Sequence, residues 1–439
     1  MVEIPNFPSL RSRLDRRLFG GAAGTVFRGM ITLTLGSGIG RIIGIAAIPV
    51  LTRLYSPESF GVLAVFTAVV TIITPLVTLR YVLALPLPRH DGVAMNLLAL
   101  SLGLMLVLTG FLALALWLWS IPLFKLVSME VLAPWWWLIA LGVLGTAVYE
   151  LLSMWATRKR NYKLIAQTTV SQSAAGTLVK IGLGLIGLQA LGLIIGQVMA
   201  QTSGVGRFVK GFWPTLRSTW RHVHFGRMRK VAWRHRGFPA WRVPSQFLMA
   251  FSMQLPTLFM ATVYDAETTG QFSLAVMALT VPVNLIGKSA GSALYGEASS
   301  AIKTNRFLVL RMCKETQIRL LLLSIAPTIL VFFGGPYIFG LLFGDRWIEA
   351  GLYASLLSIG LMFQFTSAPL IQVMNLLSKQ SSFLQINFIR LSGLLVTFCS
   401  AYFLSLQPTT TVLVLSLYSA TFYIGVSLFV LNAVSESVK

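Results

Sequence analysis

The sequence predicts an all-α, polytopic membrane protein with about twelve transmembrane helices in two six-helix lobes. Of its 439 residues, 56% are hydrophobic and only 11% are charged, whereas a soluble domain carries about 25% charged residues. The apolar residues gather in windows of roughly 20, the length that an α-helix needs to cross a bilayer. A short motif also recurs at a spacing that divides the chain into two halves.

The predicted spans follow one another from residue 27 to residue 433. A basic stretch, Arg11–Arg17, precedes the first span, which is too long for the apolar region of a cleaved signal peptide. The fifth and sixth spans are separated only by a short turn that begins and ends on glycine. The predicted spans are 27–51, 60–80, 94–118, 133–156, 164–187, 190–208, 240–262, 270–290, 316–333, 350–371, 384–405 and 411–433.

The distribution of Lys and Arg predicts the orientation. With the N-terminus in the cytoplasm, 29 of the 35 basic residues lie on the cytoplasmic side, and only Arg53, Lys125 and Arg346 lie outside. Cytoplasmic loops of membrane proteins are enriched in Lys and Arg. We therefore predict a multi-pass protein of the bacterial inner membrane with both termini in the cytoplasm.

The segment 207–242 holds ten Lys and Arg residues and no acid, interleaved with four tryptophans. Basic residues mixed with aromatics can bind nucleic acid. This segment joins two spans, so we expect it to lie on the anionic lipids of the inner leaflet instead, without a nucleic-acid partner. We predict an N-terminal lobe at 1–206, a basic cytoplasmic linker at 207–239 and a C-terminal lobe at 240–439.

An internal repeat relates the two halves. Tyr55, Glu58 and Gly61 follow the first span, and the same three residue types recur 209 residues later, after the seventh span. Both copies occupy the outer loop between the first and second helices of a six-helix half. Because both halves begin on the same side, they are parallel repeats related by a pseudo-twofold axis along the membrane normal. Transporters built in this way bind their substrates between the halves.

Charged residues inside spans are candidates for function, because a charge at the bilayer centre costs about 2.5–3.5 kcal/mol. Arg41 lies about 20 Å along its helix from Arg28, too deep to reach either surface easily. Such cations, with few acids beside them, favour an anionic substrate, and the Arg fork suits phosphate or pyrophosphate. For two of them, Arg80 and Lys288, snorkelling to the inner surface is an alternative. The candidate binding residues are Arg41, Arg80, Lys180, Lys288, Arg390 and Arg53.

Glu150 is the one acid that falls clearly inside a span. It is expected either to pair with a cavity cation or to exchange a proton or Na⁺ that drives transport. No cofactor and no metal site are expected, because the two cysteines and four histidines follow no ligand spacing. No nucleophile–base pair or phosphate-binding loop is visible, so no catalytic residue is predicted.

Four stretches carry a resemblance to a known family: Leu51–Gly61, Thr78–Pro86, Gly270–Ala275 and Phe343–Gly351. They resemble the Wzx-type oligosaccharide flippases of the multidrug/oligosaccharidyl-lipid/polysaccharide exporter superfamily. The resemblance implies a V-shaped cavity between two lobes and alternating access. It also implies flipping of an undecaprenyl-pyrophosphate-linked oligosaccharide, such as an O-antigen unit, from the cytoplasmic to the outer leaflet. Other membrane proteins of polysaccharide assembly are implied as further partners.

Within that resemblance, Arg41 in Gly40-Arg41-Ile-Ile-Gly44 matches an arginine motif of the first helix. Lipid II flippases usually carry two further helices, so twelve spans argue against a peptidoglycan precursor as substrate. A multidrug or organic-cation antiporter of the same superfamily is an alternative, which the cationic cavity disfavours. A membrane-embedded polysaccharide polymerase is another, but the outer loops are short, the longest about 16 residues. We therefore predict a flippase that is not an enzyme.

Overall fold

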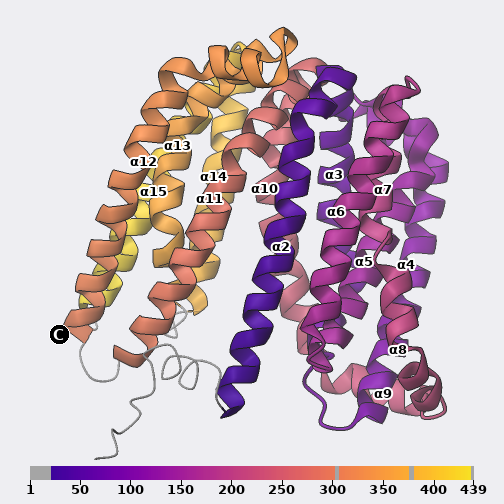
Figure 1. The fold of residues 1–439 in the computed structure, drawn as a ribbon. Helices are drawn as coiled ribbons and strands as arrows, with labels where there is room; N and C mark the ends of the chain where they lie inside the picture. Colours follow the sequence, from indigo (N-terminus) through magenta and orange to yellow (C-terminus); the bar gives the residue numbers. More distant parts are fainter. Residues whose placement is uncertain (1–20, 302–305, 375–379, 437–439) are drawn as a thin grey trace, which may run out of the picture.

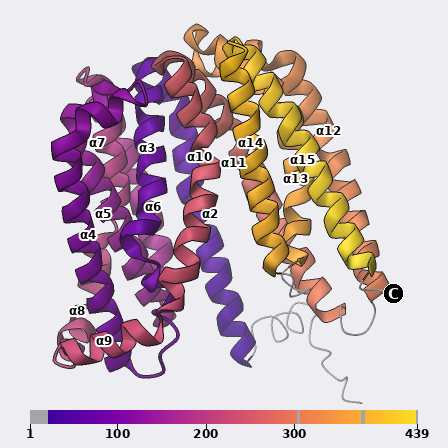
Figure 2. The ribbon, with the colours of Figure 1, turned by 180° about the vertical axis from the view of Figure 1, so that it is seen from behind.

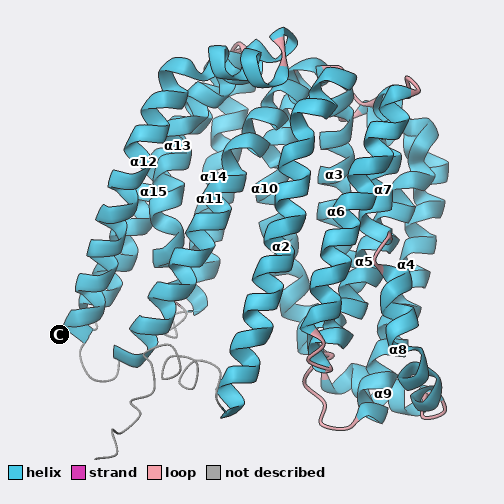
Figure 3. Ribbon diagram, viewed as in Figure 1, coloured by secondary structure: helices cyan, strands magenta, loops and turns pink. Residues whose placement is uncertain are grey.

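The computed structural model describes residues 21–301, 306–374 and 380–436, and within these ranges it is helical with no strand (Figure 3). The predicted basic stretch Arg11–Arg17 lies outside them. The first group of helices is α2 (Gly21–Leu54), α3 (Pro57–Thr78), α4 (Asp91–Lys125), α5 (Trp136–Arg158), α6 (Tyr162–Leu185) and α7 (Gln189–Thr202). The second is α10 (Val243–Val263), α11 (Ala266–Ala301), α12 (Arg306–Phe343), α13 (Ile348–Val373), α14 (Gln380–Phe403) and α15 (Pro408–Glu436).

Shorter elements connect these helices. Two helices in the basic linker, α8 (Val205–Trp220) and α9 (Phe225–Arg234), were not predicted. A π-helical turn, η3 (Phe238–Arg242), leads from them into α10. The 3₁₀ elements are η1 (Tyr81–Ala84), η2 (Glu130–Trp135) and η4 (Asp345–Trp347).

Ten of the described helices are long and apolar enough to cross a membrane, which makes this a multi-pass membrane protein. Helices α6 and α7 are not among the ten, although each coincides with a predicted span. Helix α6 is rich in Ser, Thr and Gln, and α7 has only 14 residues, about 21 Å of helix. The sixth span is shorter than the predicted 190–208 because a turn at Ser203 and Gly204 separates α7 from α8.

The two groups of helices form two lobes that meet at one end and diverge towards the other (Figures 1 and 2). We call the end that carries the α2–α3 and α10–α11 connections the closed end. The opposite end carries α8 and α9, and we call it the basic end. One buried apolar cluster fills the first lobe around Phe66 and Trp155, and another joins residues of both lobes, including Phe60 and Trp347. The residue bounds predicted for the lobes and the linker remain predictions.

The predicted repeat has a structural counterpart where α3 and α11 begin. The Ser56 hydroxyl accepts a hydrogen bond from the Ser59 amide at 3.3 Å, and the Asp265 carboxylate accepts one from the Thr268 amide at 2.6 Å. Both bonds cap a helix N-terminus, and both pairs of residues are 209 positions apart. The same local chemistry therefore starts the second helix of each lobe.

The repeated tyrosines anchor equivalent elements. The Tyr55 hydroxyl donates to the Lys180 carbonyl on α6 at 2.5 Å, and the Tyr264 hydroxyl donates to the Leu406 carbonyl at the α14–α15 turn at 2.8 Å. Burial raises the pKa of the Tyr55 phenol above its ordinary value, so this group stays a donor. Each tyrosine thus ties the end of the first helix of its lobe to the fifth helix or to the turn that follows it.

Helices α8 and α9 are amphipathic and lie at the basic end, side by side in Figures 1 and 2. They bury Phe208, Phe212 and Val231 against the first lobe. Their outer faces leave Trp213 and Trp233 more than half exposed. A basic surface with exposed indole rings is typical of a segment at a membrane interface.

Candidate functional site

The closed end is sealed where α3 crosses α11. A Cβ atom on Gly61 would lie 1.9 Å from the Ala266 carbonyl oxygen, and one on Gly270 would lie 1.7 Å from the Pro57 carbonyl oxygen. Only glycine permits so close an approach of two backbones. The repeat-related glycines Gly61 and Gly270 therefore face each other across the junction between the lobes.

Trp347, in the connection between α12 and α13, completes this seal. Its side chain is fully buried, and its indole N–H donates to the Thr52 carbonyl at the end of α2 at 3.0 Å. Its ring meets Phe60 edge-to-face, with the centroids 5.0 Å apart. A tryptophan of the second lobe thus packs against the first lobe and joins the two lobes at this end.

Towards the basic end, Arg80 connects three helices. Leu79 and Arg80 end α3 with two left-handed residues, at φ 42° and 54°. The Arg80 guanidinium donates to the Glu150 carboxylate on α5 at 2.7 Å and to the Gln246 carbonyl oxygen on α10 at 3.0 Å. The side chains of Arg80 and Glu150 are only 12% and 24% exposed. This ion pair belongs to the first lobe, and its bond to Gln246 reaches the second.

Lys180 and Arg53 are placed apart from this pair. The Lys180 ammonium donates to the Gln197 side chain on α7 at 2.7 Å, within the first lobe. Arg53 is exposed in the last turn of α2, at the closed end. Both cations are therefore remote from the basic end, where the lobes separate.

Arg41 lies midway along α2 and is exposed. The neighbouring face of α2 packs on α6, where a Cβ on Gly36 would meet Ala166 at 2.4 Å. No hydrogen-bond or ion-pair partner of the Arg41 guanidinium is present among the described residues. The side chain is thus free to meet water or an anion from the side of α2 that does not pack.

Arg390 lies on the wall of a polar cavity inside the second lobe. The cavity has a volume of about 270 Å³ and is bounded by α10, α11, α13, α14 and α15. None of the described residues that line it is acidic, and within the described chain the Arg390 guanidinium has no hydrogen-bond or ion-pair partner. The polar residues of the lining are Thr257, Thr280, Asn284, Gln364, Arg390, Ser416, Tyr418, Ser419 and Tyr423.

Lys288 continues this polar surface along α11. It is exposed and lies four residues after Asn284, which lines the Arg390 cavity. Residues four apart lie on the same face of a helix, so Lys288 sits one turn from the cavity in the direction of the basic end. The second lobe thus presents two cations, Arg390 and Lys288, along one surface.

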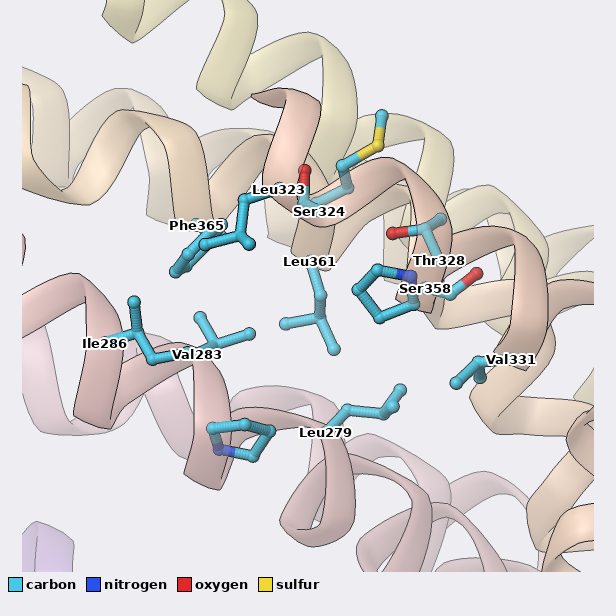
Figure 4. Close-up of a pocket in the computed structure, with 13 residues that line it drawn as sticks. Leu279, Val283, Ile286, Leu323, Ser324, Thr328, Val331, Ser358, Leu361 and Phe365 are labelled. Atoms are coloured by element: carbon cyan, nitrogen blue, oxygen red, sulfur yellow. The ribbon is translucent and has the colours of Figure 1, made fainter. Parts of the chain in front are cut away.

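A second cavity of the same lobe has the opposite character. It lies between α11, α12 and α13 (Figure 4), has a volume of about 200 Å³ and is lined almost wholly by apolar side chains. The hydroxyls of Ser324 and Ser358 donate to carbonyls of their own helices. Leu361 lines both this cavity and the Arg390 cavity. The described lining of the apolar cavity contains no charged side chain.

Residues 50–352 match the model of a family described as polysaccharide biosynthesis protein. The chain belongs to that family. Among curated proteins, none matches it by sequence.

Solved structures show that the chain has a twelve-helix, two-lobe fold. It is similar to the lipid II flippase MurJ in an inward closed conformation, with a TM-score of 0.67 and 11% identity over 93% of this chain and 90% of that chain. It is also similar to an inward-facing multidrug resistance MATE family transporter of the MOP superfamily, with a TM-score of 0.57 and 15% identity over 92% of this chain and 94% of that chain. At these identities the likeness concerns the fold alone.

The structure brings only some of the predicted cations together. Arg390 and Lys288 share one surface, whereas Arg80, Lys180 and Arg53 lie elsewhere and Arg41 lies on α2. Sequence reasoning missed the amides that hold or accompany these cations. The signal was present, since each of them interrupts an otherwise apolar span. These amides are Gln197, Gln246, Asn284 and Gln364.

Proposed function

We propose that this protein flips an undecaprenyl-pyrophosphate-linked oligosaccharide from the cytoplasmic to the outer leaflet of the bacterial inner membrane, and that it changes no covalent bond of the substrate. The observation that carries the proposal is Arg390, an arginine without a partner among the described residues, in a polar cavity with no acid in its lining. Membership of a polysaccharide biosynthesis family supports the glycan part of this assignment.

The chemistry of the cavity selects an anion. A guanidinium held inside a membrane protein costs several kcal/mol unless it meets water, an acid or an anion. Phosphate oxygens accept two parallel hydrogen bonds from the Arg fork, and a cavity of about 270 Å³ has room for a pyrophosphate. An organic cation would instead need carboxylates or an aromatic cage. This favours the flippase over an antiporter of cationic drugs.

The direction of transport follows from the placement of the basic residues. We assign the basic end to the cytoplasm, because α8 and α9 carry the Lys and Arg that the inner leaflet attracts. In that orientation the lobes are open to the leaflet in which lipid-linked sugars are made, and the Trp347 seal closes the outer side. Lys288 then lies between the cytoplasm and the depth of Arg390, where an entering pyrophosphate meets it first. Arg41 is 13 residues from the closed end of α2, and Arg390 is 13 residues from the closed end of α14, so the two arginines lie at similar depths in opposite lobes.

The test compares cells that lack this protein with cells complemented by the wild type, Arg390→Ala, Arg390→Lys or the control Arg319→Ala. The Arg319 side chain lies on α12, is 81% exposed and pairs with Glu315 at 3.6 Å. Lipid-linked oligosaccharide is extracted from spheroplasts treated with periodate, which does not cross the membrane and oxidises only sugars in the outer leaflet. We expect the alanine variant to lose at least about tenfold in the oxidised fraction. The lysine variant should recover it partly, because it keeps the charge and loses the fork.

Equal leaflet distributions in deleted and complemented cells would refute the proposed function. So would an Arg390→Ala variant that is present at wild-type amounts and flips at the wild-type rate. Export of a cationic dye that depends on this protein, with no change in lipid-linked oligosaccharide, would favour the antiporter instead.

A further inference from the structure

A groove runs between α14 and α15 on the outside of the second lobe. The two helices approach closely at Gly393, where a Cβ would lie 2.3 Å from the Tyr418 ring. From there towards the basic end they enclose a groove of about 340 Å³. Its walls include Ile389 of α14 and Phe429 of α15, which are 59% and 42% exposed. Because the groove faces the bilayer, lipid hydrocarbon can enter it from the side.

The polar groups of the groove wall offer little to a headgroup. The Thr421 hydroxyl donates to the Leu417 carbonyl of its own helix at 2.9 Å, and the Tyr418 hydroxyl is also engaged, since it donates to the Arg390 carbonyl. Among the lining residues this leaves the Gln385 amide. At position 425 the groove is empty, since a Cβ on Gly425 would find no atom within 4 Å. A volume of about 340 Å³, at roughly 30 Å³ for each water-sized group, holds about eleven heavy atoms.

Two aromatic side chains separate this groove from the Arg390 cavity. Tyr418 and Phe422 line both spaces, and their ring centroids are 6.0 Å apart. The Tyr418 hydroxyl donates to the Arg390 carbonyl at 2.9 Å, which fixes the tyrosine beside the cation. A site for an anion and a site for hydrocarbon thus share one wall.

We propose that the α14–α15 groove holds the first isoprene units of the substrate's polyprenyl chain while the pyrophosphate meets Arg390. This inference rests on the proposed function. A molecule with an anion at one end and a long hydrocarbon at the other requires the two sites to adjoin, and eleven heavy atoms correspond to about two five-carbon units. A zwitterionic phospholipid fits less well, because its ammonium would find no carboxylate in the Arg390 cavity.

Filling the groove at Gly425 tests this assignment. Gly425→Leu and Gly425→Trp place graded side chains in open space, and Gly103→Trp is the matched control on α4, where a Cβ also meets nothing within 4 Å. The new side chain should displace the polyprenyl chain from part of the groove. In the periodate assay we expect this to lower the outer-leaflet fraction roughly tenfold for Gly425→Trp and less for Gly425→Leu. The Gly103→Trp variant should match the wild type.

Two further measurements separate the groove from the rest of the protein. Binding of inorganic pyrophosphate to the purified Gly425→Trp variant, followed by titration calorimetry, should equal that of the wild type, because the Arg390 cavity is unchanged. A photoreactive benzophenone side chain at Phe429 should cross-link to polyprenyl chains in native membranes, as identified by mass spectrometry. The same group at Ile286, in the apolar cavity of Figure 4, should cross-link to phospholipid.

The groove assignment would be wrong if Gly425→Trp flipped the substrate at the wild-type rate, or if Phe429 cross-linked to phospholipid alone. The proposed function would then still stand. Polyprenyl cross-links at Ile286 instead of Phe429 would move the chain to the other cavity. If the wild-type protein does not alter the leaflet distribution at all, the proposed function fails first, and this inference fails with it.

Discussion

At the scale of single residues, the cations of this protein differ in what surrounds them. Arg80 is held by Glu150 and Gln246, and Lys180 by Gln197, whereas Arg390 faces a cavity without a partner among the described residues. Removing a cation that is already satisfied mainly disturbs packing and charge balance. Removing a cation that has no partner among the described residues should mainly weaken binding of an anionic substrate. The same residue type should therefore give opposite phenotypes at different positions.

The Arg80–Glu150 pair gives a prediction on stability. Glu150→Ala leaves a buried guanidinium without its carboxylate, and we expect this to lower the free energy of unfolding by about 3 kcal/mol. The double variant Arg80→Met with Glu150→Leu removes both charges and should be more stable than Glu150→Ala alone. Thermal unfolding in detergent measures the difference, and a double variant less stable than Glu150→Ala would contradict this account.

The same pair decides between the two roles predicted for Glu150. Glu150→Gln keeps a hydrogen-bond acceptor for Arg80 but cannot exchange a proton. If the residue only neutralises Arg80, flipping should keep its dependence on the proton and Na⁺ gradients. A loss of that dependence at normal protein abundance would identify Glu150 as the coupling residue.

At the scale of helices, the sequence predicted the elements well where composition alone determines them. Ten described helices satisfy the length and hydropathy of a span, because apolar windows of that length have no other stable state in lipid. Helix α6 packs against α2 and α7 and carries several polar residues, and α7 has only 14 residues, so neither meets those criteria. The amphipathic α8 and α9 were missed because a basic segment with Trp fits a loop or a helix on the surface equally well.

The site was less predictable than the fold, since distances between helices do not appear in a sequence. Arg80 and Glu150 are 70 residues apart and form an ion pair, and Gly61 meets a glycine of the other lobe. The repeat was visible as three recurring residue types, but its meaning required the crossing of α3 and α11. Tyr418 and Phe422 gave no signal at all, because aromatic residues are common in transmembrane helices.

The crossing of α3 and α11 gives a prediction at this scale. Gly61→Ala places a Cβ 1.9 Å from the Ala266 carbonyl oxygen, so the backbones must move apart, at a cost of about 1–3 kcal/mol or more. A Cβ at Gly103 meets nothing within 4 Å. Gly103→Ala should instead raise the free energy of unfolding by about 0.5–1 kcal/mol, because alanine favours the helix more than glycine does. We expect Gly61→Ala to lower the unfolding temperature and Gly103→Ala to raise it. Equal shifts would show that the crossing does not contribute to the stability of the closed end.

At the scale of the whole molecule, charge and shape point in the same direction. The lobes meet at the end that carries Trp347 and diverge at the end that carries α8 and α9 (Figure 1). An asymmetric molecule of this kind has one side that can accept a substrate and one that cannot. Which membrane face each end occupies therefore determines which leaflet supplies the cargo.

Cysteine labelling determines that orientation. A cysteine at Ser218, exposed on α8 at the basic end, should be protected from an impermeant maleimide in intact cells. A cysteine at Glu130, exposed at the start of η2 at the closed end, should react. Both variants carry Cys399→Ala, because that native cysteine is exposed. Labelling at position 218 in intact cells would reverse the orientation and the proposed direction of flipping.

The glycine crossing also has a mechanical consequence. It sits near one tip of α11, whose 36 residues make an arm of about 54 Å. If the lobes turn about that point, each degree of rotation sweeps the far tip through roughly 1 Å, while the fulcrum itself scarcely moves. The contact between Gly61 and Gly270 can therefore remain nearly unchanged while the lobes move apart at the basic end by the width of a sugar. This amplification requires α11 to stay straight. If the helix bent freely at Pro282, rotation at the crossing would not displace its far end.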